Sequence, residues 1–493
     1  MANNNRQIRL ADFSGGESAM FPVFNTPSKY SALLQNMHIS ERGTIKKIPG
    51  YVAVNSTPVA EPLQTGFEYR KASGTTQLLA AGGGKVFTVG TTLTQIQSGM
   101  NTQARVFFTQ MNDLCIMSNG ISADGPKKWD GTTLSNLGGT PPPTAFKMHA
   151  HRGRVWAIER QNKMMASHSA LSNPEDWTTS NNAGYIDFRY VLPTGDELLD
   201  IATFVDLLVF FFRNHVVIYS GSNPTSSGDF AMTQCISGVG VIDTGTVQAL
   251  GTDMSFLSLG GVKTLRQVVA TGSLDVGDMS EQINPLVRGD IQEGSAGSFS
   301  SAHLPRLGWL MQSIKDTVWL YNYQRKAWGR MVGADVRGMF STIAGDVYIT
   351  GSGYVYKYGS GWSFAGLAPV CVWSLAWIAL DRSARVAMPK SLELLLAPAP
   401  QATKLNVSFR YDMDIQRFEH SFEIVGTVTS PGTEDVDSVN NWDNIDPLDS
   451  LSQQPTKLPL FGSGRRMQIT LSNQSATSIE VVDFIIIAVI GGQ

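Results

Sequence analysis

The stretch DTVWLYNYQRKAWGRM, residues 316–331, decides the expected fold. Bulky and smaller side chains alternate along it, a charged tetrapeptide interrupts the alternation, and a second tryptophan follows. Alternation with a period of two indicates β-strands, because successive side chains of a strand point to opposite faces of its sheet. The interruption indicates a tight turn. The stretch therefore predicts a β-hairpin.

Hairpins of this kind recur along the chain at spacings of roughly 36 to 54 residues. Their first strands are expected to begin near residues 77, 113, 154, 206, 254, 308 and 346. A small twisted sheet cannot bury both of its faces alone, whereas sheets stacked around a ring can, and the ring leaves only short edges exposed. The fold class is therefore expected to be all-β, with a β-propeller of about seven blades. A large meandering β-sandwich is the alternative, although the recurring glycine and asparagine turns favour the propeller.

The composition also indicates a globular β-protein. Of 493 residues, 42% are hydrophobic and 16% charged, with 48 glycines and 22 prolines, which is typical of turn-rich β-proteins rather than helical or disordered ones. Lysine and arginine number 38 and aspartate and glutamate 41, so the net charge is −3. Without a positive excess there is no counterion release to hold a phosphate backbone, and tight nucleic-acid binding is disfavoured.

Cysteine usage and hydropathy indicate where the chain folds. The cysteines, Cys115, Cys235 and Cys371, are far apart and odd in number, which disfavours a disulfide framework and favours a reducing cytoplasm. The N-terminal residues lack the apolar core of a signal peptide. The longest apolar runs, 367–380 and 201–212, are shorter than the roughly 20 residues of a membrane-spanning helix. We therefore expect buried strands there and no membrane span.

Three parts are expected along the chain. Residues 1–62 are expected to form an N-terminal arm, in which residues 30–35 could make a helical turn. Residues 63–365 would form the propeller, and the longer strand patterns of 366–493 predict a C-terminal antiparallel β-sandwich domain. An acidic loop at 426–456 lies inside this last part. Its acidic residues, which we expect to be exposed and to repel phosphate, are Glu434, Asp435, Asp437, Asp443, Asp446 and Asp449.

No stretch matches a catalytic or cofactor site. GGGK at 82–85 lacks the first glycine and the final serine or threonine of a phosphate-binding loop, so a β-turn is expected. His149 and His151 could in principle hold a metal, but no third ligand lies near them in the sequence. SADGPKKW at 122–129 is similar to the box of sialidase blades, but its glycine comes one position early and no second copy exists. We expect no catalytic residue, no metal, no cofactor and no enzymatic activity.

Five stretches together carry a family resemblance. They are DFSGG (12–16), GTIKKIPGY (43–51), the hairpin units at 154–177 and 206–224, and MSFLSLGGVKTL (254–265). In this order they resemble the tail nozzle proteins of short-tailed bacteriophages, a family also called the tail hub or packaged-DNA stabilisation proteins. The resemblance spans residues 10 to 365 and rests on the order of the stretches and the blade pattern rather than on one motif.

The resemblance implies a structural virion protein of the phage tail that assembles in the host cytoplasm. It implies a homohexameric ring docked beneath the head-to-tail adaptor, with the propellers outward and the rest lining a channel that retains viral double-stranded DNA and conducts it during ejection. Tail fibre or tailspike and a tip plug or needle would be further partners. A mildly acidic protein would let DNA slide without sticking. The acidic loop is then the candidate channel gate, with an ordinary solvated loop as the alternative.

Two other classes of function stay open. A carbohydrate-binding propeller for host-surface recognition would show exposed tryptophans and tyrosines clustered on one face, although packing between blades is the usual role of the ten tryptophans. A glycoside hydrolase would show two carboxylates in a central pocket.

Overall fold

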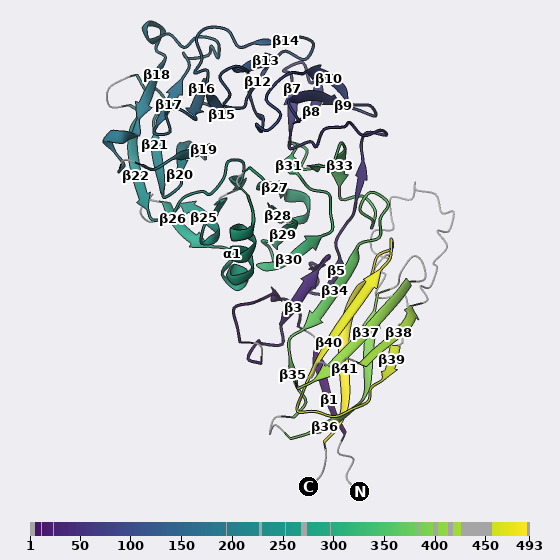
Figure 1. Ribbon diagram of the computed structural model, residues 1–493. Helices are drawn as coiled ribbons and strands as arrows, with labels where there is room; N and C mark the ends of the chain where they lie inside the picture. The colour runs from purple at the N-terminus through teal and green to yellow at the C-terminus, as the bar shows by residue number, and fades with distance from the viewer. Residues whose placement is uncertain are drawn as a thin grey trace, which may run out of the picture. The chain divides into compact units, whose positions relative to one another are not determined.

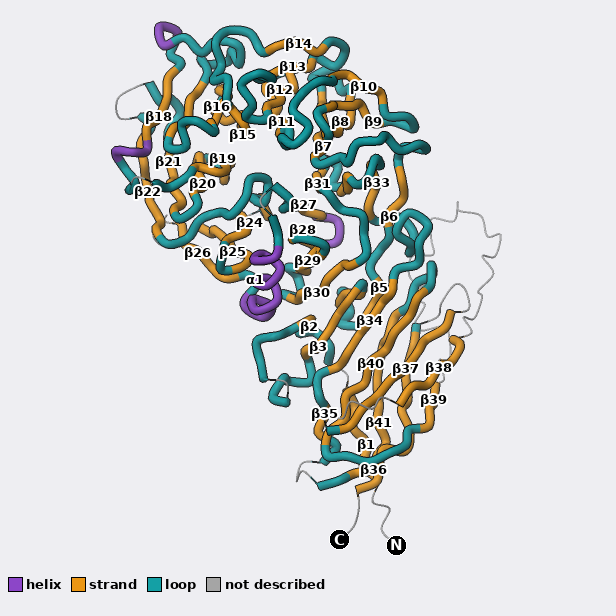
Figure 2. The backbone as a smooth tube through the Cα atoms, viewed as in Figure 1, coloured by secondary structure: helices purple, strands orange, loops and turns teal. Residues whose placement is uncertain are grey.

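The computed structural model describes most of the chain. The described residues are 5–10, 12–22, 24–193, 195–225, 229–251, 253–267, 274–295, 297–381, 385–397, 403–412, 418–424 and 456–490. In this part the secondary structure is almost entirely β, with a single α-helix, α1 (Asn284–Glu293) (Figure 2). The all-β expectation is confirmed. The chain divides into two compact units, a sandwich unit of Met1–Val52, Trp319–Ala334 and Gly359–Gln493, and a ring unit of Ala53–Val318 and Asp335–Tyr358.

Five complete four-stranded antiparallel sheets, which we call blades one to five, follow one another in the ring unit (Figure 1). Each is built from four strands that are consecutive in the sequence. Blade one consists of β7 (Thr65–Arg70), β8 (Thr76–Gly82), β9 (Lys85–Val89) and β10 (Thr94–Gln97). Blade two consists of β11 (Phe107–Met111), β12 (Leu114–Ser118), β13 (Lys127–Trp129) and β14 (Leu134–Asn136), and blade three of β15 (Ala145–His151), β16 (Arg154–Glu159), β17 (Met165–His168) and β18 (Gly184–Asp187). Blade four consists of β19 (Leu198–Phe204), β20 (Leu207–Phe212), β21 (His215–Ser220) and β22 (Ala231–Ser237), and blade five of β23 (Gln248–Leu250), β24 (Asp253–Ser258), β25 (Gly261–Gln267) and β26 (Leu274–Asp278).

Blades six and seven begin in the ring unit in the same way. Blade six starts with β27 (Ser300–Leu304) and β28 (Trp309–Ile314), and blade seven with β31 (Gly338–Ser341), β32 (Val347–Thr350) and β33 (Val355–Tyr358). The boundary between the units falls inside the next strand of each sheet, β29 (Thr317–Asn322) and β6 (Tyr51–Ala53). The predicted hairpin at 316–331 is present as β29 and β30 (Ala327–Val332). The structure therefore contains the seven-bladed propeller that the repeats predict.

The first strand of each blade is its innermost strand, and these strands meet around the ring. β11 contacts β7 and β15, β15 contacts β19, β23 contacts β27, and β31 contacts both β27 and β7. Blades four and five share an apolar core, which completes the circle. The segment before β7 also completes blade seven. The Val54 amide donates to the Val355 carbonyl at 2.8 Å, and the Leu63 amide donates to the Gly351 carbonyl at 2.9 Å. Residues expected to belong to the arm therefore help to close the ring.

The predicted blades begin one strand too late. The positions given by the sequence pattern, from 77 to 346, fall on or one residue before β8, β12, β16, β20, β24, β28 and β32, which are the second strands. These strands are conspicuous because they are buried on both faces; every residue of β16 is buried, for example. The innermost strands mix polar and apolar residues, as in AFKMHAH of β15, so their pattern does not mark them as core strands.

The sandwich unit contains two sheets assembled from distant parts of the chain (Figure 1). The first has the order β39 (Thr456–Pro459), β36 (Ala387–Leu396), β41 (Glu480–Ile490), β5 (Ile45–Lys47) and β4 (Met37–Ile39), and β1 (Asn5–Leu10) also pairs with β41. The second has the order β30, β3 (Tyr30–Gln35), β34 (Val370–Leu375), β40 (Arg466–Gln474), β37 (Thr403–Tyr411) and β38 (Phe418–Ile424), with β2 (Gly16–Glu17) on β3 and β35 (Ile378–Ala379) on β40. One core, which includes Trp373, Phe409 and Phe484, is shared by both sheets.

The N-terminal segment is part of this sandwich, and the compact units differ from the predicted parts 1–62, 63–365 and 366–493. Residues 30–35 form strand β3 rather than a helical turn, because β3 is paired with β34 on one side and with β30 on the other. Phe13 and Leu34 are buried in the sandwich core. The apolar sequences of the segment find their partners more than 300 residues away, so a local reading of the sequence does not recognise them as strands.

The two long apolar runs are strands as expected. The run 201–212 covers most of β19 and β20, and the run 367–380 covers β34 and β35. Within the described ranges, no helix is long and apolar enough to cross a membrane.

Candidate functional site at the axis of the ring

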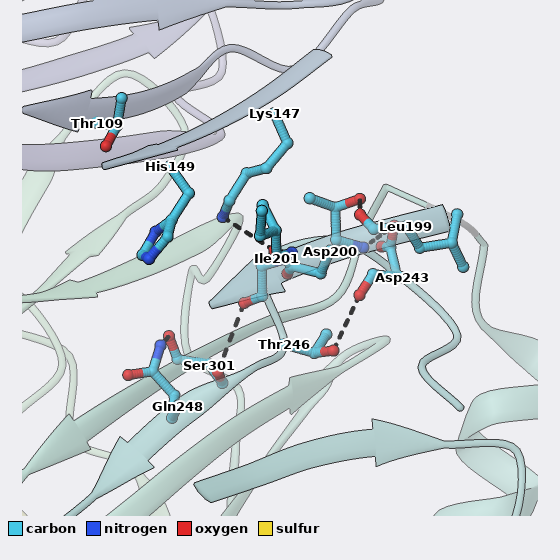
Figure 3. A network of polar contacts seen from close by, with 12 residues as sticks. Thr109, Lys147, His149, Leu199, Asp200, Ile201, Asp243, Thr246, Gln248 and Ser301 are labelled. Atoms are coloured by element: carbon cyan, nitrogen blue, oxygen red, sulfur yellow. Dashed lines mark hydrogen bonds and ion pairs between the residues drawn. The ribbon is translucent and has the colours of Figure 1, made fainter. Parts of the chain in front are cut away.

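Polar side chains from several blades meet where the innermost strands converge (Figure 3). The Lys147 ammonium of β15 lies 3.4 Å from the Asp200 carboxylate of β19. The Gln248 amide of β23 donates to the Ser301 carbonyl of β27 at 3.0 Å. The first interaction joins blades three and four, and the second joins blades five and six.

Arg105, two residues before β11 of blade two, bonds a segment on the other side of the ring. Its Nη1 donates to the carbonyl of Phe299, which immediately precedes β27 of blade six, at 2.7 Å. Only 8% of the Arg105 side chain is exposed. Asp243, just before blade five, and Asp200 of blade four both act electrostatically on its guanidinium. A side chain that precedes blade two is therefore hydrogen-bonded to the segment before blade six, which is not its neighbour in the ring.

The two aspartates are held by backbone amides. Asp200, which is 1% exposed, accepts hydrogen bonds from the amides of Ile201 at 2.8 Å and Gly245 at 2.7 Å. Asp243 accepts from the amides of Thr244 at 2.9 Å and Gly297 at 2.7 Å. Burial raises the pKa of Asp243, although Arg105 and the backbone donors oppose this rise. Both carboxylates thus have their oxygens engaged within the ring.

This arrangement bears on the glycosidase alternative. Two carboxylates do lie near the ring centre, but both accept hydrogen bonds from backbone amides, and Asp200 also pairs with the Lys147 ammonium at 3.4 Å. A retaining or inverting glycosidase needs one carboxyl group that can protonate a leaving oxygen and another that reaches the sugar or a water. Carboxylates that are occupied by backbone amides, and in Asp200 also by an ammonium, are better suited to holding the blades in place.

His149 and His151 lie within β15, on the face that meets blade four. His149 Nε2 is 2.8 Å and His151 Nδ1 is 2.9 Å from the hydroxyl of Thr203 in β19. Burial lowers the pKa of His149 to about 3 and that of His151 to about 4, with smaller contributions from nearby positive groups. Both rings are therefore neutral near pH 7. Over the described residues, no group of three or more histidine, cysteine, aspartate or glutamate side chains is arranged to hold a metal ion.

The other stretches singled out in the sequence form turns. Gly83 and Gly84 both have positive φ in the turn between β8 and β9, and Lys85 pairs with Glu61 at 2.6 Å. In the sialidase-like stretch, Asp124 accepts a hydrogen bond from the Asn101 amide at 2.9 Å, which fixes the loop before β13. The six acidic residues of the candidate gate, Glu434 to Asp449, lie outside the described residues.

Most tryptophans serve packing. The buried ones are Trp129, Trp156, Trp309, Trp319, Trp328, Trp373 and Trp377. The exposed aromatic side chains in blade three are tyrosines. Tyr185 on its outermost strand is 62% exposed, and Tyr190 just after it is 90% exposed. Arg189 lies between them in sequence, forms a bidentate ion pair with Asp187, and interacts electrostatically with both tyrosines.

The sequence pattern did not indicate the polar residues near the axis. A signal was available for Asp200, because a charged residue within the apolar sequence LLDIATF must be paired when it is buried. No comparable signal marks Arg105 in NTQARVFF, since its partners come from residues about 95 to 194 positions later.

Comparison with known proteins gives no family. Neither a protein-family model nor a curated protein matches the sequence. Solved structures similar to this chain include the extracellular domain of the putative one-component system BT4673 from B. thetaiotaomicron (12% identity, TM-score 0.45, 65% of this chain) and a streptogramin B lyase (12%, 0.42, 62%). PorZ, a surface component of the type-IX secretion system of Porphyromonas gingivalis, is another (10%, 0.37, 71%).

The aligned region covers different shares of these structures. It spans 41% of the BT4673 domain, 44% of PorZ and 96% of the lyase. At such low identities and TM-scores, these similarities carry no conclusion about activity or partners.

Proposed function

We propose that this protein is a structural subunit of the tail nozzle of a short-tailed bacteriophage, in which it forms a ring that retains packaged DNA and conducts it during ejection. The observation that carries the proposal is that neighbouring inner strands contact each other around the propeller and that Arg105 bonds the Phe299 carbonyl across it. The propeller then acts as a rigid body rather than as a pore of its own, and the DNA path lies between copies of the chain. A ring of identical subunits needs such rigid contact surfaces.

The stretches behind the family resemblance support the proposal by their structural roles. DFSGG brings Gly16, with φ of +69°, against the backbone of Trp328, where an added Cβ would lie 2.7 Å from the carbonyl oxygen. Only glycine allows this approach. GTIKKIPGY supplies β5, which pairs with β41. These stretches build the sandwich unit, while the other three supply strands of blades three, four and five.

The partners and the gate belong to the same proposal. The nozzle would be a homohexamer beneath the head-to-tail adaptor, would contact a tail fibre or tailspike and a tip plug or needle, and would act in the virion without enzymatic turnover. The acidic residues between Glu434 and Asp449 would repel DNA phosphates at a narrow point of the channel and move aside during ejection.

The first test is the mass of the purified chain, measured by light scattering and negative-stain imaging, alone and after mixing with the head-to-tail adaptor. We expect rings of about six copies, alone or on the adaptor. A monomer that ignores the adaptor would overturn the proposal.

A second candidate, a carbohydrate-binding propeller for host-surface recognition, is favoured by the exposed tyrosines of blade three. Tyr185 and Tyr190 could stack on sugar rings, and the Asp187–Arg189 pair could hydrogen-bond sugar hydroxyls. A glycan array tests it. Binding that disappears in Tyr185→Ala/Tyr190→Ala and persists in the half-buried control Tyr354→Ala would support this candidate, and an array without binding would remove it.

A further inference from the structure

We propose that blades three and four form a binding site for a carboxylate group, in which Arg154 and Trp156 of β16 are the hydrogen-bond donors. The inference stands independently of the proposed function. It assigns a ligand to two buried N–H groups that have no acceptor among the described residues.

Arg154 is a buried cation whose protein partners are all neutral. Only 3% of the residue is exposed. Its Nη1 donates to the carbonyls of Ser169 at 2.8 Å and Asn182 at 2.6 Å, and its Nη2 donates to the side-chain oxygen of Asn223, between β21 and β22 of blade four, at 3.4 Å. In the part of the chain that the structure describes, Arg154 forms no ion pair. Burial lowers the pKa of Arg154. A buried charge without a counter-charge is costly, so this guanidinium is suited to an anionic ligand.

One edge of the Arg154 guanidinium has the geometry that binds a carboxylate. Nε is buried and has no hydrogen-bond partner within the described residues. Nε and Nη2 lie on the same edge of the planar group, and such a pair of donors can bind both oxygens of a carboxylate. On this edge the protein supplies only the long contact with Asn223. The same Asn223 oxygen also accepts from the amide of Thr225 at 3.2 Å and from its hydroxyl at 2.8 Å, so a carboxylate oxygen can replace it at Nη2.

Trp156 supplies another donor on the same face of blade three. Arg154 and Trp156 are two residues apart in β16, so their side chains point to the same face of the sheet. This face meets blade four, because Trp156 packs against Phe210 and Phe230. Trp156 is 1% exposed, and its indole Nε1 is buried with no partner among the residues described. An indole N–H can only donate, so the group that it lacks is an acceptor oxygen.

The walls of the site favour a single negative charge. The rings of His168 and Phe230 pack against Trp156, and His168 is neutral near pH 7 because burial lowers its pKa to about 4. One guanidinium among such rings is neutralised by one carboxylate, whereas a phosphate dianion would add an unpaired buried charge. Gly184, opposite His168 on β18, keeps this wall low: a Cβ there would meet only the His168 ring within 4 Å beyond its chain neighbours.

The test is fluorine NMR of the whole chain labelled with fluorotryptophan. The Trp156 resonance is identified by its absence from the spectrum of Trp156→Phe. When acetate replaces chloride at constant ionic strength, we expect a saturable shift of the Trp156 resonance at millimolar acetate, because its indole N–H gains an acceptor. The resonance of Trp309, which lies in β28 of blade six, should not move. Phosphate at the same ionic strength should bind more weakly than acetate.

Two variants separate a carboxylate site from an arginine that serves the fold alone. Arg154→Lys keeps the charge but loses the planar pair of donors, so the acetate concentration at half-saturation should rise about tenfold. Arg160→Lys changes an exposed arginine that follows β16 and should leave the titration as in wild type. The wild-type titration decides the inference even if Arg154→Lys does not fold. A Trp156 resonance that acetate does not move, equal half-saturation in Arg154→Lys and wild type, or tighter binding of phosphate than of acetate would overturn the inference.

Discussion

The ring unit and the sandwich unit bury similar β-sheets but assemble them in different ways. In the ring, blades one to five are each four consecutive strands, so their pairings are local in the sequence. In the sandwich, β3 from the N-terminal segment lies between β30 and β34, and β41 at the other end of the chain pairs with β1. Because its pairing is local, each blade can form separately during folding. The sandwich can form only when three distant segments of the chain come together.

This difference predicts how many strands a core substitution destabilises in each unit. We expect the largest effect from Trp373→Ala. Trp373 is buried in the sandwich core, packs against Phe13 and Phe484, and donates a hydrogen bond to the Ser31 hydroxyl at 2.9 Å. Its loss should cost about 3–5 kcal/mol. Hydrogen exchange should then accelerate in β1, β3, β34 and β41 together, because one core holds all of them.

The matched control for this prediction is Trp156→Ala in blade three, where Trp156 is equally buried and contacts Phe210 of blade four. Faster exchange should stay within blades three and four. Exchange that accelerates across all blades, or Trp373→Ala effects confined to β34, would contradict the contrast between the two units.

The second effect concerns the buried ion pair that fastens the N-terminal segment. Glu17 of β2 is fully buried, pairs with Arg330 of β30 through both of its oxygens, and accepts a hydrogen bond from the Leu34 amide at 3.2 Å. Glu17→Gln leaves the half-buried Arg330 cation without its counter-charge, and we expect a loss of about 3 kcal/mol in the free energy of unfolding of the sandwich unit.

Urea unfolding of a double-mutant cycle checks this expectation. Glu17→Gln combined with Arg330→Met should cost less than the sum of the single changes, since the pair is removed as a whole. Glu293→Gln, which removes the exposed partner of Lys315 in the ring unit, is the control and should change little. Strict additivity of the two sandwich substitutions would contradict the pairing.

The third effect is the loss of folding stability at acidic pH, which should be greater in the ring unit than in the sandwich unit. His149, His151 and His168 lie in the ring with pKa values lowered by burial to about 3, 4 and 4, whereas His38, at about 4, lies in the sandwich. Between pH 6.5 and about 4 the unfolded chain binds protons that the folded ring excludes. Stability is therefore fully present above about pH 6.5 and falls by up to about 1.4 kcal/mol per pH unit for each histidine as the pH drops.

Urea midpoints measured at pH 7.5, 6 and 5 test the direction. His149→Asn/His151→Asn should flatten the pH dependence of the ring transition, and His38→Asn should flatten only that of the sandwich. A ring whose stability rises as the pH falls would show that the histidines are not buried in their neutral form.

The smallest effect concerns two residues in the left-handed region, one in each unit. Val205, in the turn between β19 and β20, has φ of +54° and is 67% exposed, so a β-branched side chain adopts a strained conformation there without gaining burial. Asn36 in the sandwich has the same φ, but asparagine tolerates it and its side chain bonds Val332 and Val370.

We expect Val205→Asn to raise the thermal stability of the ring by about 1 kcal/mol, because asparagine adopts the left-handed region at lower cost. Asn36→Val should instead lower the free energy of unfolding of the sandwich unit. Calorimetry measures both changes. If Val205→Asn lowers the free energy of unfolding instead, the valine side chain makes a contact that stabilises the ring by more than the backbone strain costs.

The number of blades in the ring was predictable from the sequence. The error in where each blade begins has a physical cause. The second strands were found because residues such as Val155 and Ile158 of β16 are buried on both faces. The innermost strands escaped because their polar residues, such as Lys147 and His149, are paired across blades rather than exposed to water. An interpretation based on sequence pattern assumes that polar side chains are exposed to solvent. Near the axis of this propeller, polar side chains are buried and paired with one another.

The sequence by itself determined the all-β class, the number of blades and the strand nature of the apolar runs, because alternation and turns are written in neighbouring residues. Only the tertiary structure decided that the N-terminal segment belongs to the sandwich and that Arg105 bonds the segment before blade six. Both depend on partners far along the chain, Leu34 with Trp373 in one core and Arg105 with Phe299 across the ring. Such pairs are selected by the burial of apolar surface and the pairing of buried charge, which become defined only when the whole chain folds.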